Sequence, residues 1–163
     1  LKLGKFGILN NTIETGKIFG DAQLSVLSPV PANQTYSLVA NTFSLLNYYD
    51  FVVDQFLVGH FEHHFNGYIL NKIPVIKKLK LRSLMTFRGV LGNISDSNTA
   101  INRSSIIYNA PKKLYYEYGF GVENIGFGNL RLFRIDCIWR SEFNNPNNSS
   151  PNFGVRLGMS PDF

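Results

Sequence analysis

Apolar and polar residues alternate with a period of two over long stretches of this 163-residue chain. The clearest stretch is the carboxyl end, where apolar residues take every second position from Phe153 to Phe163 and small or polar residues lie between them. Successive side chains of a strand point to opposite faces, so the pattern predicts a strand with one apolar and one polar face. The same pattern predicts further strands at 5–19, 53–70, 75–92, 114–125 and 130–143.

The predicted strands are long, at about 11–18 residues against the usual 5–6 of soluble sheets. A tilted strand of about 9–11 residues crosses a bilayer. The connections at 71–74 and 126–129 are short turns, whereas 93–113 and 144–151 are long and polar. Outer-membrane barrels combine short turns on one side with long loops on the other. We therefore expect an all-β fold, an antiparallel transmembrane β-barrel. A soluble β-sandwich with one wet face is the alternative.

Six strands are too few to close such a barrel, because the smallest bacterial examples use eight and lipid forbids open sheet edges. We therefore expect residues 1–163 to be the carboxyl-terminal part, about six strands, of a larger barrel. The chain begins at Leu1 rather than at Met, so we expect its start to be processed or truncated. The expectation is that the remaining strands and an amino-terminal domain are absent from it.

Composition excludes several other classes. The chain is 44% hydrophobic and only 17% charged, below the roughly 25% of soluble domains. It is too apolar for a disordered chain, and a lone Cys137 cannot form a disulfide scaffold. No apolar run approaches the roughly 20 residues of a membrane-spanning helix.

The two rows of each strand predict two environments. The polar rows are expected to line the barrel interior as a hydrogen-bond and ion-pair network, and the row of 75–92 includes Lys78 and Lys80. The members singled out for this network are His60, Glu62, His64, Arg82, Arg88, Glu117, Glu123, Arg134, Asp136 and Arg140. The apolar rows are expected to face lipid, chiefly through Phe87, Tyr118, Phe120, Phe133 and Trp139.

The sequence gives less support for metal binding, catalysis or nucleic-acid binding. His60, Glu62 and His64 share one strand face, but such residues lie about 6.7 Å apart and converge poorly on one metal ion. A barrel enzyme acting on lipids would need a Ser–His–acid arrangement, which spacing alone cannot show. Lysines at 77–82 alternate with apolar residues rather than forming a nucleic-acid patch. We expect no metal, no cofactor, no catalytic residues and no nucleic-acid partner.

The carboxyl end resembles the signal by which outer-membrane barrels are recognised for insertion. An extended edge with an aromatic anchor can add to another sheet. This predicts contact with the outer-membrane assembly machinery during insertion, through Phe153, Val155, Leu157, Met159 and Phe163.

Several stretches together resemble a known family. They are GKIFGDAQLSVL (16–27), NYYDF (47–51), FEHHFNGYILNKIPVIKKLKLR (61–82), YYEYGFGVENIG (115–126), FRIDCIWR (133–140) and FGVRLGMSPDF (153–163). They resemble the carboxyl-terminal barrel region of a Bacteroidetes-type outer-membrane family, described as carboxypeptidase-regulatory-like-domain proteins with a domain of unknown function. A more distant similarity is to BamA-type barrels, although their Arg-Gly-Phe-type tip motif is missing.

The resemblance implies a location in the bacterial outer membrane and supplies no established activity. The similarity to BamA-type barrels implies that residues 20–52 form a long external loop or a plug-like segment. The expected function is therefore that of an integral outer-membrane β-barrel, in contact with membrane lipid, serving in envelope biogenesis or as a subunit of a larger outer-membrane complex. The alternative is a channel or transporter for a small solute.

Overall fold

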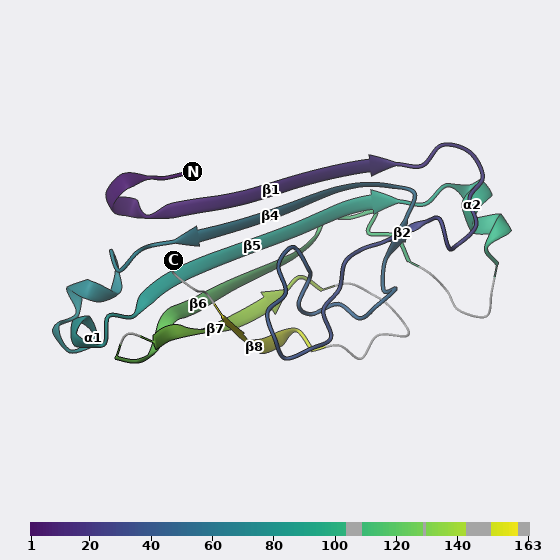
Figure 1. Cartoon of the computed structure of the whole chain (residues 1–163). Coiled ribbons are helices and arrows are strands. Elements are labelled where there is room, and N and C mark those ends of the chain that lie inside the picture. Colours follow the sequence, from purple (N-terminus) through teal and green to yellow (C-terminus); the bar gives the residue numbers. More distant parts are fainter. Residues whose placement is uncertain (104–108, 129, 143–150, 160–163) are drawn as a thin grey trace.

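The computed structural model describes residues 1–103, 109–128, 130–142 and 151–159. Six long strands form one antiparallel sheet in the order β1-β4-β5-β6-β7-β8, and β2 and β3 form a separate short pair (Figure 1). This confirms the predicted all-β, antiparallel class. The strands are β1 (Ile8–Lys17), β2 (Ser28–Pro29), β3 (Val52–Val53), β4 (Gln55–His64), β5 (Arg82–Asn93), β6 (Tyr115–Phe127), β7 (Leu130–Arg140) and β8 (Phe153–Met159). The helices are α1 (Pro74–Leu79) and α2 (Asp96–Ile101), with 3-10 turns at Gly4–Phe6 and Leu70–Lys72.

Alternation along the strands gives the sheet two faces of opposite character. In β6, Tyr118 and Phe120 are exposed on one face, whereas Tyr115 and Glu117 are buried on the other. Directly paired residues of an antiparallel sheet share a face, so the register carries each face across the strands. One such row is aromatic across five strands and consists of Phe61, Phe87, Tyr118, Trp139 and Phe153. We call the face with this row the outer face and the opposite one the inner face.

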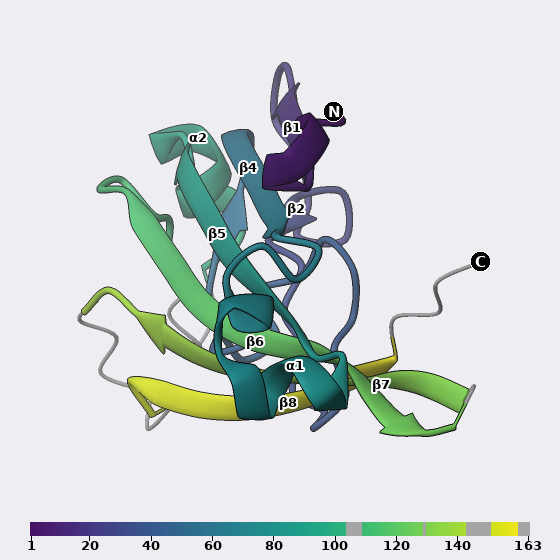
Figure 2. The ribbon, with the colours of Figure 1, turned by 90° about the vertical axis from the view of Figure 1, so that its left-hand side faces the viewer.

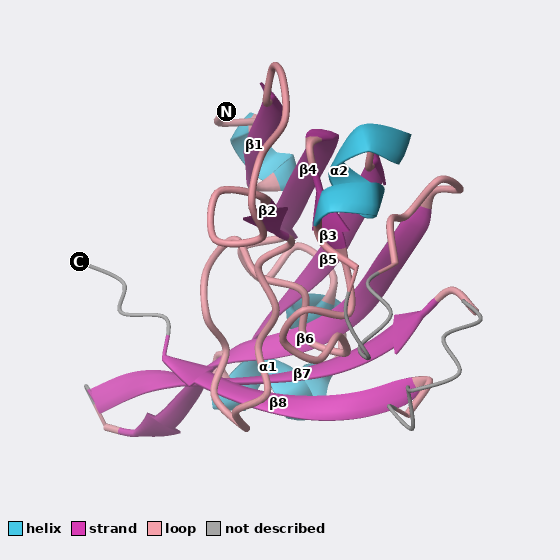
Figure 3. Ribbon diagram, turned by 90° about the vertical axis from the view of Figure 1, so that its right-hand side faces the viewer, coloured by secondary structure: helices cyan, strands magenta, loops and turns pink. Residues whose placement is uncertain are grey.

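The sheet is curved (Figure 2), and the inner face lies on its concave side, since Tyr115 and Glu117 of that face contact residues 43–44 there. Residues 20–52, which we call the inner segment, lie within this concavity (Figure 2), and Figure 3 shows that the concavity is filled mostly by loops. Phe43 and Phe51 of the segment pack edge-on against Tyr115 of β6, with ring centroids 5.6 and 5.4 Å apart. Val58 and Val90 of the sheet complete this cluster. The apolar core therefore lies between the sheet and its own inner segment.

The predicted strand at 75–92 is wrong over its first seven residues. Pro74–Leu79 form α1, and β5 begins only at Arg82. Proline is well suited to the first helical turn, because the N–H that it lacks would have no partner there. Lys80 ends the helix in the left-handed conformation, with φ at 52°. Lys78 and Lys80, assigned to the inner row, are exposed instead.

The strand predicted at 53–70 is also shorter, because β4 ends at His64. The short turn predicted at 71–74 is therefore part of a longer connection, 65–81, that includes a 3-10 turn and α1. Within the described part of the chain, neither helix is long and apolar enough to cross a membrane.

Candidate functional site

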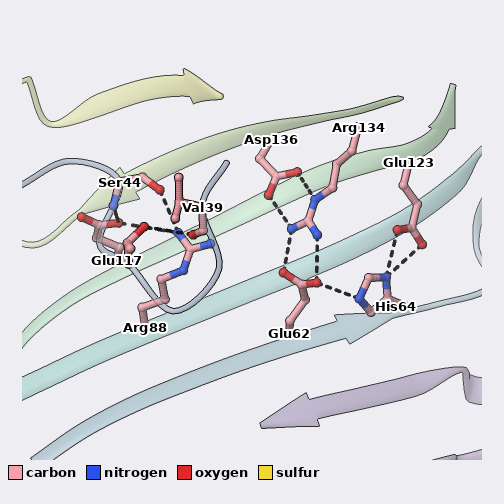
Figure 4. Close-up of polar contacts among 10 residues, drawn as sticks. Val39, Ser44, Glu62, His64, Arg88, Glu117, Glu123, Arg134 and Asp136 are labelled. Atoms are coloured by element: carbon pink, nitrogen blue, oxygen red, sulfur yellow. Dashed lines mark hydrogen bonds and ion pairs between the residues drawn. The ribbon is translucent and has the colours of Figure 1, made fainter. Parts of the chain in front are cut away.

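The inner face brings charged residues of four strands together in two clusters (Figure 4). Register places them: His60 of β4 lies opposite Arg88 of β5, Arg88 opposite Glu117 of β6, and Glu117 opposite Arg140 of β7. The first cluster is centred on Arg134 and the second on Glu117.

Arg134 bridges two carboxylates with both edges of its guanidinium. Nη1 and Nη2 donate to the two oxygens of Glu62, each at 2.8 Å, and Nε and Nη2 donate to Asp136 at 2.8 and 2.7 Å. Asp136 is completely buried. Bidentate geometry of this kind is available to arginine but not to lysine. The cluster therefore ties β4 to β7 across two intervening strands.

His64 lies between two glutamates in the same cluster. Its Nδ1 is 2.9 Å from Oε2 of Glu123, and its Nε2 is 2.8 Å from Oε1 of Glu62. Carboxylates only accept hydrogen bonds, so this geometry fits an imidazolium that donates from both nitrogens. His64 thus joins β6 to the Glu62–Arg134–Asp136 group.

Glu117 holds the inner segment to the sheet. Its side chain is 1% exposed and accepts the backbone N–H groups of Ser44 and Leu45 at 2.7 and 2.8 Å. The Tyr115 hydroxyl also donates to it, at 2.8 Å, and Arg88 Nη1 lies 3.8 Å away. A buried carboxylate with such partners is costly to remove, because each donor would then be left unsatisfied.

Two arginines bind the backbone carbonyl groups of the same stretch. Arg140 Nη1 donates to the Leu45 carbonyl at 3.1 Å, and Arg156 Nη2 donates to the Ser44 carbonyl. Glu117, Arg140 and Arg156 therefore fix both the donors and the acceptors of residues 44–45. No side chain of the segment itself is needed for these bonds.

The inner segment also bonds to the edge of β8. Leu38 N–H donates to the Leu157 carbonyl at 2.6 Å, and Leu157 N–H donates to the Tyr36 carbonyl at 2.9 Å. Gly158 leaves room for the Leu38 side chain, since a Cβ there would lie 2.7 Å from Leu38 Cδ1. The segment thus covers part of a strand edge that would otherwise be unpaired.

Asp54 and Asn98 anchor the beginning of the inner segment near α2. Asp54 Oδ2 accepts the Ser95 N–H at 2.7 Å and Asn98 Nδ2 at 2.9 Å, and Asn98 Oδ1 accepts the Ala22 N–H at 2.7 Å. Burial raises the pKa of Asp54, but the hydrogen bonds from Ser95 and Asn98 outweigh it and leave the pKa below its usual value.

Replacing Asp54 by Ala should lower the free energy of unfolding at neutral pH by about 1–3 kcal/mol, since hydrogen bonds to charged groups are lost. A lowered folded-state pKa stabilises the protein above the unfolded value of about 3.9 and ceases to do so as the pH falls through the folded value. Denaturant titrations of wild type and Asp54→Ala should therefore differ at pH 7 and converge in acid. A difference that stays constant down to the lowest pH would contradict this role.

A polar cavity of about 430 Å³ lies between the Arg134 cluster and residues 38–40 of the inner segment. Asn10, Glu62, His64, Glu123 and Arg134 line its sheet side. The charged groups of this wall bind mainly one another. Among the described residues, no group of three or more His, Cys, Asp or Glu is arranged to hold a metal ion.

All ten residues singled out for the polar network lie on the inner face. Five form the Arg134 cluster, namely Glu62, His64, Glu123, Arg134 and Asp136; three, Arg88, Glu117 and Arg140, form the Glu117 cluster. Among the described residues, His60 forms no hydrogen bond or ion pair with the carboxylates of the Arg134 cluster or of the Glu117 cluster. It packs against Phe43 with ring centroids 5.4 Å apart, and its buried Nδ1 has no hydrogen-bond partner among the described residues. Arg82 lies opposite Glu123 in the register.

The donors to Glu117 from Tyr115 and from the backbone of the inner segment were not predicted from the sequence. Tyr115 donates to Glu117, and alternation could have identified it, since it lies two positions away on the same face. The role of the Ser44 and Leu45 backbone could not be predicted, because every residue except proline carries the same backbone N–H group.

The residues expected to face lipid all lie on the outer face. Phe87, Tyr118, Phe120 and Phe133 are exposed, and Trp139 is half-buried between Tyr118 and Phe153. The apolar residues of the carboxyl-terminal pattern, Phe153, Val155, Leu157 and Met159, are exposed on β8. Phe163 lies outside the described residues.

The fold and the site define an antiparallel all-β protein with an apolar outer face and a charged inner face that its own inner segment occupies. Residues 1–96 match the model of the family described as "Family of unknown function (DUF5686) C-terminal domain". The match covers more than half of the chain, so the chain belongs to this family, and the predicted membership in a family of unknown function is confirmed. The chain matches no curated protein and no solved structure.

Proposed function

We propose that the chain is the carboxyl-terminal part of an integral β-barrel of the bacterial outer membrane. It is not an enzyme, and it serves in envelope biogenesis or as a subunit of a larger outer-membrane complex. One observation carries this proposal. Large apolar side chains are exposed on the outer face and charged side chains are buried on the inner face, which is the reverse of their usual distribution in soluble proteins. Soluble monomers rarely expose apolar patches beyond a few hundred Å².

A bilayer around the outer face explains why apolar side chains are exposed there. It also requires that the edge strands of the sheet be hydrogen-bonded. In a bilayer every backbone polar group must find a partner within the protein, so strands persist only in a closed barrel. β1 and β8 are the two edges of the present sheet. Additional strands would close the barrel between them, where they would replace the hydrogen bonds of Tyr36 and Leu38 to the β8 edge, and this edge would meet the assembly machinery during insertion.

The inner segment supports a filled interior rather than a wide pore. It packs against the sheet through the apolar cluster around Tyr115 and is hydrogen-bonded to Glu117 beside that cluster. A channel or transporter for a small solute is the second candidate, favoured by the polar cavity beside Arg134. Single-channel recordings separate the two, since a transporting pore conducts steadily and a filled barrel does not.

The test of the membrane proposal is fractionation of the full-length protein from its host. The protein should accompany the outer membrane, resist extraction by alkaline carbonate, and migrate differently on denaturing gels before and after boiling. A protein that is released by carbonate, with mobility unchanged by heat, would contradict the proposal.

A further inference from the structure

The two ends of the sheet differ in charge. The end that carries α1 includes residues 1–7, the connection 65–81 and the β6–β7 turn, and we call it the α1 end. Among the described residues, its exposed charged side chains are all basic: Lys2, Lys5, Lys72, Lys77, Lys78 and Lys80. The exposed acidic side chains of the described residues, Glu14, Asp21, Asp96 and Glu142, lie towards the opposite end. The sequence contains no acidic residue from 63 to 95.

The α1 end also exposes large apolar side chains beside these lysines. Val75 is 76% exposed, and Ile69, Ile73 and Leu79 are exposed as well. Phe127 at the β6–β7 turn is 93% exposed. Apolar side chains interleaved with lysines are typical of segments that lie at a membrane interface, where the apolar groups enter the acyl boundary.

This surface is held in place by contacts with the sheet. Asn124 Nδ2 of β6 donates to the Lys80 carbonyl at 2.6 Å, and Arg131 of β7 donates to the Leu79 carbonyl. On the other side, the Tyr68 ring packs edge-on against Phe6 at 5.2 Å, and Lys72 Nζ lies 4.4 Å from the Tyr68 ring centroid. The lysines are therefore presented by a fixed part of the fold.

We propose that the α1 end binds a bilayer surface of anionic phospholipid. Val75, Ile73 and Leu79 would enter the headgroup boundary beside the apolar outer face, while the lysines pair with lipid phosphates. The charge of the surface decides the partner, because no exposed acidic group among the described residues of this end would oppose anionic headgroups. Basic residues near such a surface each favour binding substantially at low ionic strength. This inference rests on the proposed membrane location.

The chain offers a matched pair of variants, since adjacent exposed lysines occur at both ends. Lys77→Gln with Lys78→Gln changes the α1 end, and Lys112→Gln with Lys113→Gln removes the same charge from the opposite end. The full-length protein is reconstituted in bilayers of phosphatidylcholine mixed with phosphatidylglycerol. The ratio of the two lipids that remain bound after mild detergent extraction is then measured.

Wild type and Lys112→Gln/Lys113→Gln should retain phosphatidylglycerol in excess of its bulk fraction. In Lys77→Gln/Lys78→Gln this enrichment should be lower, by a factor of about five for each lysine removed. No enrichment in wild type, or an equal loss in both double variants, would overturn the inference. The heat-dependent gel mobility of the same samples tests membrane integration separately, so inserted protein without lipid preference refutes only this inference.

Discussion

Replacing Phe120 by Asp should prevent the full-length protein from integrating into the membrane. Phe120 is exposed at 54% in the middle of the outer face. Removing the phenyl ring from apolar surroundings costs about 1.5–3 kcal/mol. A lipid-facing charge adds to this, by about 2–4 kcal/mol for Arg or Lys at the midplane and less for Asp. The measurement is the fraction of protein that resists carbonate extraction and shows heat-dependent mobility.

The control places the same carboxylate on the inner face. Thr86 lies on the inner face but does not suit this control. It is 2% exposed and lies opposite Glu62, so a carboxylate there would be buried beside another one. Asn10 of β1 also lies opposite Glu62, but its side chain is exposed on the inner side and lines the polar cavity, where water screens the added charge, so Asn10→Asp should integrate normally. Equal loss of integration in Asn10→Asp and Phe120→Asp would refute the assignment of the two faces.

Period-two alternation predicted the strands well wherever it was sustained. The segment 114–125 became β6 at Tyr115–Phe127, and 130–143 became β7 at Leu130–Arg140. Alternation failed at 75–81, where a few lysines and aliphatic residues fit one turn of helix as well as a strand. Pro74, which suits the first turn of a helix, was the local signal against a strand there.

The inner face was predictable, but its contacts were not. Strand alternation alone placed His64, Glu123 and Arg134 on one side of the sheet. Their pairing depends on the register between strands far apart in sequence, and His64 and Glu123 are separated by 59 positions. The bonding of Glu117 to Ser44 and Leu45 depends in addition on how the inner segment folds back, which no periodic pattern encodes.

Replacing Glu117 by Leu should release the middle of the inner segment from the sheet. The backbone N–H groups of Ser44 and Leu45, and the Tyr115 hydroxyl, lose their buried acceptor. Each unsatisfied donor costs about 1–3 kcal/mol, and a loss of about 3 kcal/mol raises the released population roughly a hundredfold. In planar bilayers, wild-type full-length protein should be silent or nearly so, and Glu117→Leu should show frequent openings.

The Glu142→Leu variant serves as the control, since it removes an exposed carboxylate just beyond β7 and should remain silent. Glu117→Gln keeps one acceptor oxygen and should give an intermediate opening frequency. Protease sensitivity of residues 36–45 reports release of the segment independently of current. Release without any conductance would show that the inner segment does not fill the pore, whereas steady current through the wild type would favour the solute channel instead. The same carboxylate therefore distinguishes the two candidate functions, because only in a filled barrel does its loss convert a closed interior into an open one.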